Sequence, residues 1–334
     1  MKRSTARHDR VRRHSFRPGF GSFLALIVVF GVGTFFISNR ISEAPAPLDE
    51  PLHPDAEWEA TWGPSSAFCE RAMPPLVCAH GGDINVAAPN TIGAIRGVPY
   101  TGAKCVEIDA SRTKDGQLVT IHNRELAELL DIRSANVGDF TLDELVGLDP
   151  RGSEKIPTLY EALRMALSLE FAMITVDTKP GPPRHDDLFA ADVLAVLEHA
   201  NCSTTCQVWA KSDKIVQDTA SLSPSTQAGY VVMNQTEQAR LEGADKVARL
   251  REASPRVAAT YYGMVDQALV AEAHSLEREV HAWTVNDPVA MRQVLNAGVD
   301  AIVTNFPTQI QAAVTTLQAK CRAETDGPVD LRAA

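Results

Sequence analysis

The sequence predicts an α/β protein built as a (β/α)8 TIM barrel. From Leu76 onward, short runs of β-branched and apolar residues alternate with segments of helical periodicity, as in a parallel sheet covered by helices. The alternation extends over residues 76–318, a length that accommodates eight β/α units. An open doubly wound sheet is the alternative, but no glycine-rich nucleotide-binding pattern follows a predicted strand.

The predicted strands slightly outnumber the eight of a barrel. They are residues 76–79, 105–110, 118–122, 172–177, 206–210, 228–233, 256–260, 280–285 and 300–304. Helical periodicity covers residues 91–97, 141–147, 158–169, 187–199, 236–251, 265–278 and 287–297. The pair Asp115-Gly116 is a tight-turn sequence and predicts a local hairpin between the second and third strands.

The chain ahead of the barrel predicts a membrane anchor. Residues 20–37 carry no charge, and as a helix they would be about 27 Å long, close to the hydrocarbon thickness of a bilayer. A basic head, residues 1–19, precedes this segment, and a proline-rich linker, residues 38–75, follows it. By the positive-inside rule the N-terminus is cytoplasmic and the barrel lumenal or extracellular. The alternative is a cleaved signal or transit peptide, which would leave the body secreted or in an organelle. Residues 319–334 are expected to form a flexible tail.

The charge distribution argues against a nucleic-acid partner. The 334 residues carry a formal charge of -10, and the basic head contributes +6 of opposite sign. The remainder is therefore strongly acidic and would repel a phosphate backbone. Hydrophobic residues make up 45% of the chain and charged residues 22%, values typical of one globular body.

The six cysteines fall into two groups. Cys78 and Cys105 lie in apolar, strand-like runs, where a buried free thiol is expected. The others could pair in an oxidising lumen: Cys69, Cys202, Cys206 and Cys321.

Polar side chains mark the ends of the first two predicted strands. His80 ends the first, and Glu107 and Asp109 lie two residues apart on the second. Side chains at this spacing point to the same side of a strand, so the two carboxylates converge. Their repulsion within an apolar strand is relieved by a cation, and oxygen ligands suit Mg²⁺ or Ca²⁺. An exposed strand face is the alternative reading of the pair.

The next strands add further polar groups. His122 ends the third, and Asp177 and Lys179 repeat the two-residue spacing at the end of the fourth. A single histidine of this kind is more often structural, and an acid–lysine pair is often an ordinary salt bridge at the rim of a barrel. Because the ends of parallel strands meet at one face of a barrel, the combination predicts a hydrolytic site.

Seven motifs carry a resemblance to a known family. They are AHGG at 79–82, PNT at 89–91, EIDASRTKDGQLVTIHN at 107–123, IPTLYEAL at 156–163, VDTKP at 176–180, WTVND at 283–287 and TNFP at 304–307. In this order they resemble the glycerophosphodiester phosphodiesterases, TIM-barrel relatives of the phosphatidylinositol phospholipases C. The resemblance covers about 230 residues, essentially the whole predicted barrel.

The resemblance implies roles for the residues already singled out. His80 and His122 would be the acid/base pair. A divalent metal, Mg²⁺ or Ca²⁺, would be bound by Glu107, Asp109 and Asp177, the last in a place where glutamate is common.

Two further contacts and three departures follow from the same resemblance. Lys179 would contact the phosphate, and Trp283 would line the pocket or equally be a core aromatic of its strand. The family usually has arginine at the place of Gly81, glutamate at that of Pro89 and aspartate at that of Asn123.

The expected function is a membrane-anchored, metal-dependent phosphodiesterase. It would hydrolyse glycerophosphodiesters, or related lysophospholipids, to a glycerol phosphate and an alcohol. Two alternatives are a phospholipase D-like hydrolase of lysolipids or sphingolipids, and an anchored binding barrel that has lost turnover.

Overall fold

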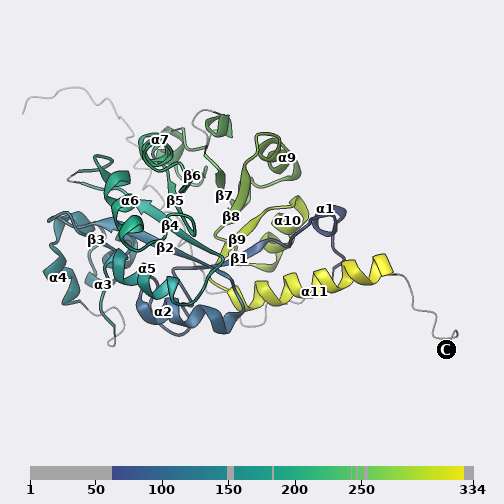
Figure 1. Cartoon of the computed structure of the whole chain (residues 1–334), viewed down its shortest axis with the longest axis horizontal. Helices are drawn as coiled ribbons and strands as arrows, with labels where there is room; N and C mark the ends of the chain where they lie inside the picture. The colour runs from purple at the N-terminus through teal and green to yellow at the C-terminus, as the bar shows by residue number, and fades with distance from the viewer. Residues whose placement is uncertain are drawn as a thin grey trace, which may run out of the picture. The chain divides into compact units, whose positions relative to one another are not determined.

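The computed structural model describes residues 62–148, 154–182, 184–241, 243–245, 247–251 and 255–326. The parallel strands are β1 (Leu76–His80), β2 (Cys105–Arg112), β4 (Met173–Lys179), β5 (Cys206–Ala210), β6 (Gln227–Val232), β7 (Val257–Tyr261), β8 (Glu279–Trp283) and β9 (Ala301–Thr304). They close into an eight-stranded barrel, because β1 pairs with both β2 and β9 (Figure 1). The predicted TIM barrel is confirmed.

The one strand of the described chain outside the barrel, β3 (Leu118–Val119), forms the predicted hairpin. It pairs antiparallel with the end of β2, with Ser111 opposite Val119. The turn between them contains Gly116 at a φ of +85°, a conformation that glycine adopts without steric cost.

Helices surround the strands (Figure 1). They are α1 (Ser66–Cys69), α2 (Ile92–Gly97), α3 (Asn123–Leu130), α4 (Leu142–Val146), α5 (Leu159–Leu167), α6 (Phe189–His199), α7 (Asp213–Leu222), α8 (Glu237–Leu241), α9 (Gln267–Ser275), α10 (Pro288–Ala297) and α11 (Pro307–Asp326). Short 3₁₀ segments are η1 (Val98–Thr101), η2 (Val137–Asp139), η3 (Val247–Arg251) and η4 (Tyr262–Met264). Side chains such as Thr158 and Asp287 cap the first turns of α5 and α10 by accepting backbone N–H bonds.

Alternation along the strands separates two layers of side chains. On β2, Val106 and Ile108 pack outward into the main core against the helices. Cys105 belongs to the smaller cluster inside the barrel, and Glu107 and Asp109 share its side of the strand. A parallel barrel therefore directs both carboxylates inward.

Several helices differ from the sequence-based expectation. The helix expected over 236–251 is two short segments, α8 and η3, separated at Gly243, whose φ is +72°. α3, α7 and α11 were not predicted. α11 continues to Asp326, so the boundary expected after residue 318 lies inside a helix, and α1 lies in the expected linker.

All six cysteines form disulfides. Cys78 and Cys105 are bonded to each other, so the expectation of free thiols was wrong. The cause is register, since the parallel pairing of β1 with β2 sets these residues opposite one another. The other bonds are Cys69–Cys321 and Cys202–Cys206, as the sequence allowed.

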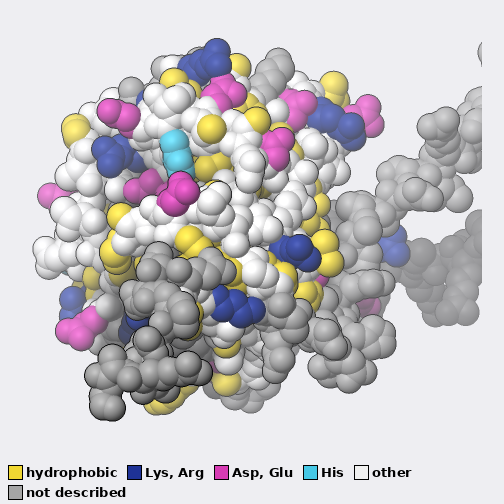
Figure 2. All heavy atoms as spheres, turned by 90° about the vertical axis from the view of Figure 1, so that its right-hand side faces the viewer, with side chains coloured by type: hydrophobic (Ala, Val, Ile, Leu, Met, Phe, Trp, Pro, Cys, Tyr) yellow, Lys and Arg dark blue, Asp and Glu magenta, His cyan; other side chains and the backbone are white. Residues whose placement is uncertain are grey.

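The predicted anchor, residues 20–37, and the head before it lie outside the described residues. Within the described part of the chain, we find no helix with the length and apolarity needed to cross a bilayer. Seen from the α11 side, acidic and basic side chains are mixed with uncharged ones (Figure 2).

Candidate active site

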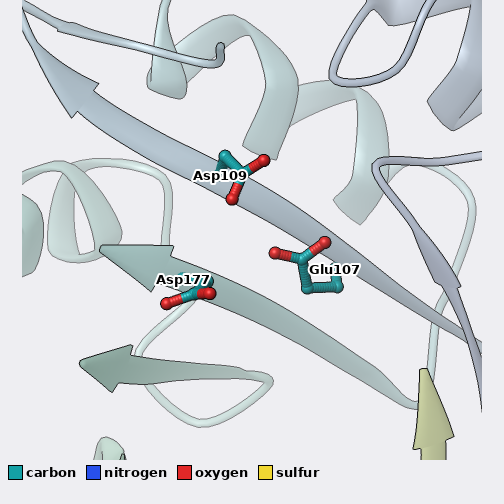
Figure 3. A group of neighbouring side chains, drawn as sticks. All are labelled: Glu107, Asp109 and Asp177. Carbon is teal, nitrogen blue, oxygen red and sulfur yellow. The ribbon is translucent and has the colours of Figure 1, made fainter. Parts of the chain in front are cut away.

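Three carboxylates converge inside the carboxyl-terminal end of the barrel. Glu107 and Asp109 come from β2 and Asp177 from β4, and one oxygen of each lies within 4.8 Å of the others (Figure 3). The register of the two strands sets Asp109 directly beside Asp177. Glu107 and Asp109 are buried, with exposures of 2% and 1%. The structure thus brings the three predicted ligands together.

Lys179 lies beside two of these carboxylates. Its Nζ is 2.9 Å from Asp109 Oδ1 and donates a hydrogen bond to Asp177 Oδ2. Burial lowers the pKa of Lys179, but Asp109 and Asp177 raise it by more, so the ammonium stays charged. Burial likewise raises the pKa of Asp109, and Lys179, His122, Arg124 and His80 together more than reverse this shift.

Glu107 is compensated only in part, by Lys179 and the Gly81 N–H. Burial and the adjacent Asp109 charge raise its pKa well above the usual value. Its Oε2 accepts one backbone hydrogen bond, from the N–H of Gly81 at 3.2 Å. One ammonium cannot neutralise three carboxylates, and Asp109 Oδ1 accepts no hydrogen bond of good geometry within the described chain. This donor set fits a divalent cation that prefers oxygen ligands.

His80 ends β1 next to Glu107. Its Nδ1 is 2.7 Å from Asn305 Oδ1, and its Nε2 is 3.9 Å from Glu107 Oε2. An amide oxygen only accepts, so Nδ1 carries a proton and Nε2 of the neutral ring keeps its lone pair. Burial lowers the pKa of His80, and the positive charge of Arg124 lowers it further.

His122 is held in the opposite tautomer. It caps α3, and its Nδ1 accepts the backbone N–H of Arg124 at 3.1 Å. Glu125 completes the cap, because its Oε2 accepts the N–H of His122 at 3.1 Å. With Nδ1 occupied as an acceptor, the proton of the neutral ring lies on Nε2.

Asn90 orients Asp109, a role that sequence reasoning missed. Its Nδ2 donates to Asp109 Oδ2, and its Oδ1 accepts the N–H of Asp109, both at 2.9 Å. Asn90 has a φ of +62°, a conformation stabilised by the Asn90 N–H bond to Gly81 O at 2.7 Å. The side-chain Nδ2 of Asn90 also lies 3.1 Å from Oε2 of Glu125. Burial and the negative charge of Asp109 raise the pKa of Glu125 to about 7.

The missed residues lay within motifs of the sequence. Asn90 belongs to PNT and Asn305 to TNFP, but both strings suggested only a resemblance. Each lies in a loop, so no strand periodicity indicated the direction of its side chain. The signal available was the position of each motif directly after a predicted strand or before a helix.

Trp283 ends β8 and is half-buried. Its Nε1 donates to Ala259 O at 2.8 Å, and its ring centroid is 6.0 Å from that of Tyr261. It also packs against the cluster inside the barrel. Its expected contact with substrate stays a prediction.

Comparison with known proteins identifies the fold and the family. The profile of the Glycerophosphoryl diester phosphodiesterase family matches residues 80–309, which include all the site residues described above. The chain belongs to this family. The plant glycerophosphodiester phosphodiesterase GDPD4 of Arabidopsis thaliana is 38% identical over 258 residues, covering 75% of this chain and 76% of the relative.

Solved structures of family members share the barrel. A glycerophosphodiester phosphodiesterase from Parabacteroides distasonis superposes with a TM-score of 0.62 at 22% identity, over 72% of this chain and 97% of that one. A phosphodiesterase from Oleispira antarctica, solved with its product sn-glycerol-3-phosphate, gives a TM-score of 0.60 at 25% identity, over 72% of this chain and 97% of its own. This phosphodiesterase thus has relatives that match across the whole barrel.

Proposed function

We propose that this phosphodiesterase hydrolyses glycerophosphodiesters to a glycerol phosphate and an alcohol, using Mg²⁺ or Ca²⁺. The observation that carries the proposal is the triad of Glu107, Asp109 and Asp177, two of them buried, whose negative charge the Lys179 ammonium balances only in part. The Oleispira antarctica relative, solved with sn-glycerol-3-phosphate, supports the assignment of the product. When bound to the triad, the cation would neutralise charge on the phosphate oxygens.

The two histidine tautomers support complementary roles. His80 has a lone pair at Nε2 and takes the proton of the attacking hydroxyl, from water or from the neighbouring glycerol hydroxyl. The new oxygen–phosphorus bond forms as the bond to the leaving oxygen breaks, and the neutral ring of His122 stabilises the leaving oxygen by a hydrogen bond from its Nε2–H. The leaving oxygen takes its proton from solvent, and His80 returns its own proton to solvent. Where the glycerol hydroxyl attacks, the first product is a cyclic phosphate, which water opens to glycerol phosphate in a second step of the same kind.

Lys179 contributes positive charge next to the triad. Its ammonium bridges Asp109 and Asp177, so it lowers the repulsion within the metal site. The direct phosphate contact suggested by the family resemblance would require Lys179 to turn from one carboxylate toward the substrate.

Turnover by the full-length protein tests the proposal. The purified chain in detergent is assayed with glycerophosphocholine, glycerophosphoethanolamine and lysophosphatidylcholine, with Mg²⁺, with Ca²⁺ and with a chelator. We expect release of glycerol phosphate that the chelator abolishes and one of the cations restores. Release of phosphocholine instead, or activity that is indifferent to chelation, would contradict the proposal. Cleavage of the lysolipid alone would favour the lysolipid alternative.

The location of the enzyme belongs to the same proposal. We infer a single-pass anchor at residues 20–37 that leaves the barrel in a lumen or outside the cell. Three disulfides support this inference, because they persist in oxidising compartments and are rare in the cytosol. Protease added to sealed vesicles should spare the barrel until detergent is added. Digestion without detergent would reverse the topology.

A further inference from the structure

The loop after β1 has no room for a side chain beside His80. Gly81 has a φ of +63°, and a Cβ there would lie 2.9 Å from Cβ of Pro89. A cationic side chain therefore cannot reach the phosphate from this position. Positive charge for the phosphate must enter the barrel mouth from another element.

Arg124 brings a guanidinium to the same place from α3. Its Nη2 lies 3.5 Å from Nε2 of His80, while its backbone N–H bonds to Nδ1 of His122. One residue therefore contacts both histidines. It is the second residue of α3, so the helix start fixes its backbone, and its side chain is half-buried.

The guanidinium lies next to the place that the phosphate has to occupy. His80 Nε2 lies 3.5 Å from Nη2 of Arg124 and 3.9 Å from Oε2 of Glu107, so it is close to both the guanidinium and the metal-binding triad. A phosphodiester attacked beside His80 must place its phosphorus near this nitrogen. Its two non-bridging oxygens then face the triad on one side and Arg124 on the other.

The donor geometry also favours an anion at this position. The guanidinium of Arg124 lies 3.5 Å from Nε2 of His80, and its charged N–H groups form stronger hydrogen bonds to phosphate oxygens than neutral donors do. The planar fork of arginine suits two oxygens of one phosphate better than an ammonium does.

We propose that Arg124 is a substrate-binding residue whose guanidinium grips the non-bridging oxygens of the phosphate. The inference rests on the proposed phosphodiesterase function and deepens it, since it assigns the phosphate to the space between α3 and the end of β1. In this chain the phosphate-directed charge comes from the start of a helix, in place of the loop after the first strand.

Variants of Arg124 test the assignment against a matched control. Arg133 is exposed just beyond the end of α3, so Arg133→Gln removes the same charge from the same region. For Arg124→Gln we expect kcat/KM to fall about 10- to 100-fold, as loss of a charged hydrogen bond implies. The inhibition constant of glycerol 3-phosphate should weaken by a similar factor. Arg124→Lys should recover part of each loss, and Arg133→Gln should change neither.

A second set of measurements excludes a purely structural role. The melting temperature and the cation concentration for half-maximal activity should be the same in Arg124→Gln and Arg133→Gln. Guanidinium ion at millimolar concentration should partly restore Arg124→Ala and have no effect on the wild type. Unchanged product inhibition in Arg124→Gln, or a loss matched by Arg133→Gln, would overturn the inference. Product binding by calorimetry is read independently of turnover, so an inactive wild type would reject the proposed function and still leave this test intact.

Discussion

The two ends of the barrel hold carboxylates in opposite electrostatic settings, a half-buried Asp300 at one end and a buried Glu107 at the other. At the amino-terminal end, Asp300 precedes β9 and accepts three hydrogen bonds. The donors are Arg71 Nη2 at 2.6 Å, the N–H of Val280 at 2.7 Å and His274 Nε2 at 2.8 Å. At the carboxyl-terminal end, Glu107 faces other acids and accepts one backbone hydrogen bond, from Gly81.

The pKa values of these two residues shift in opposite directions for this reason. Burial raises the pKa of Asp300, but Arg71, the N–H of Val280 and His274 together lower it below the usual value. Burial and Asp109 both raise the pKa of Glu107. A carboxylate with its partners inside the protein stabilises the fold, whereas one without them destabilises it and is available to bind a ligand. The amino-terminal end therefore serves stability and the carboxyl-terminal end serves chemistry.

Neutralising the triad should have the largest effect of all. We expect Glu107→Gln or Asp109→Asn to lower kcat/KM by at least about 10³-fold, roughly 4 kcal/mol, because the cation loses a charged ligand. The metal-free melting temperature of Glu107→Gln should stay equal or rise, because a repulsive charge has been removed. Steady-state kinetics and thermal unfolding with chelator measure the two effects. Full activity in a folded variant would remove the metal assignment.

Removing either histidine should have the next largest effect. His80→Ala and His122→Ala are each expected to lower kcat by about 10²-fold or more, through loss of the proton acceptor at His80 and of the hydrogen bond to the leaving oxygen at His122. Asn305→Ala should lower kcat roughly 10-fold, because His80 keeps its ring but is no longer held in one tautomer. Circular dichroism checks that each variant is folded. A histidine variant with wild-type kinetics would lose its assigned role.

The amino-terminal end should respond in stability alone. Asp300→Asn is expected to lower the free energy of unfolding by about 2 kcal/mol at pH 7, because three hydrogen bonds lose their charged acceptor. Activity below the melting transition should not change. Asp143→Asn, on the exposed first turn of α4, is the control and should stay within about 0.5 kcal/mol of wild type.

The effect of Asp300→Asn should also depend on pH. The folded pKa of Asp300 lies below that of the unfolded chain, so its stabilisation is complete above the unfolded value of about 3.9. The stabilisation is lost as the pH falls through the folded pKa. Urea unfolding of both proteins should therefore show a difference that is constant from pH 7 to pH 5 and shrinks in stronger acid. A difference independent of pH would show that the carboxylate charge is not its source.

The smallest predicted effect compares two glycines in the left-handed region. Gly81 lies at the active site and Gly116 in the β2–β3 hairpin, with φ of +63° and +85°. Gly116→Ala should cost about 1 kcal/mol from backbone strain alone, since a Cβ there meets nothing within 4 Å. Gly81→Ala should cost more and also raise KM, because its Cβ would strike Pro89. Equal costs, measured by urea unfolding, would show that the loop after β1 adjusts freely.

The strand-borne part of the site could be predicted from the sequence. Glu107 with Asp109, and Asp177 with Lys179, are two residues apart on strands, and a pleated strand directs such pairs to one side. The barrel closure then brings both pairs together, as parallel register requires. The TIM barrel itself could be predicted too, because strands and helices alternate along the sequence.

The loop-borne part could not be predicted in this way. Asn90, Asn305 and Arg124 reach the site from a loop or from the first turn of a helix, where no fixed period relates sequence position to side-chain direction. The Cys78–Cys105 bond depends on cross-strand register, which the spacing of the two residues in the sequence does not reveal.

The Cys69–Cys321 bond makes the barrel a covalent ring as well as a hydrogen-bonded one. It joins α1, ahead of the first strand, to α11, behind the last, and spans 252 residues of chain. Because it closes so long a loop, such a link lowers the conformational entropy of the unfolded chain and destabilises the unfolded state by roughly 5 kcal/mol. A tensile force applied to the chain ahead of Trp62 is therefore transmitted through the disulfide to α11 and does not separate β1 from the neighbouring strands. A protease cut in any barrel loop leaves two pieces that migrate as one molecule until a reductant separates them.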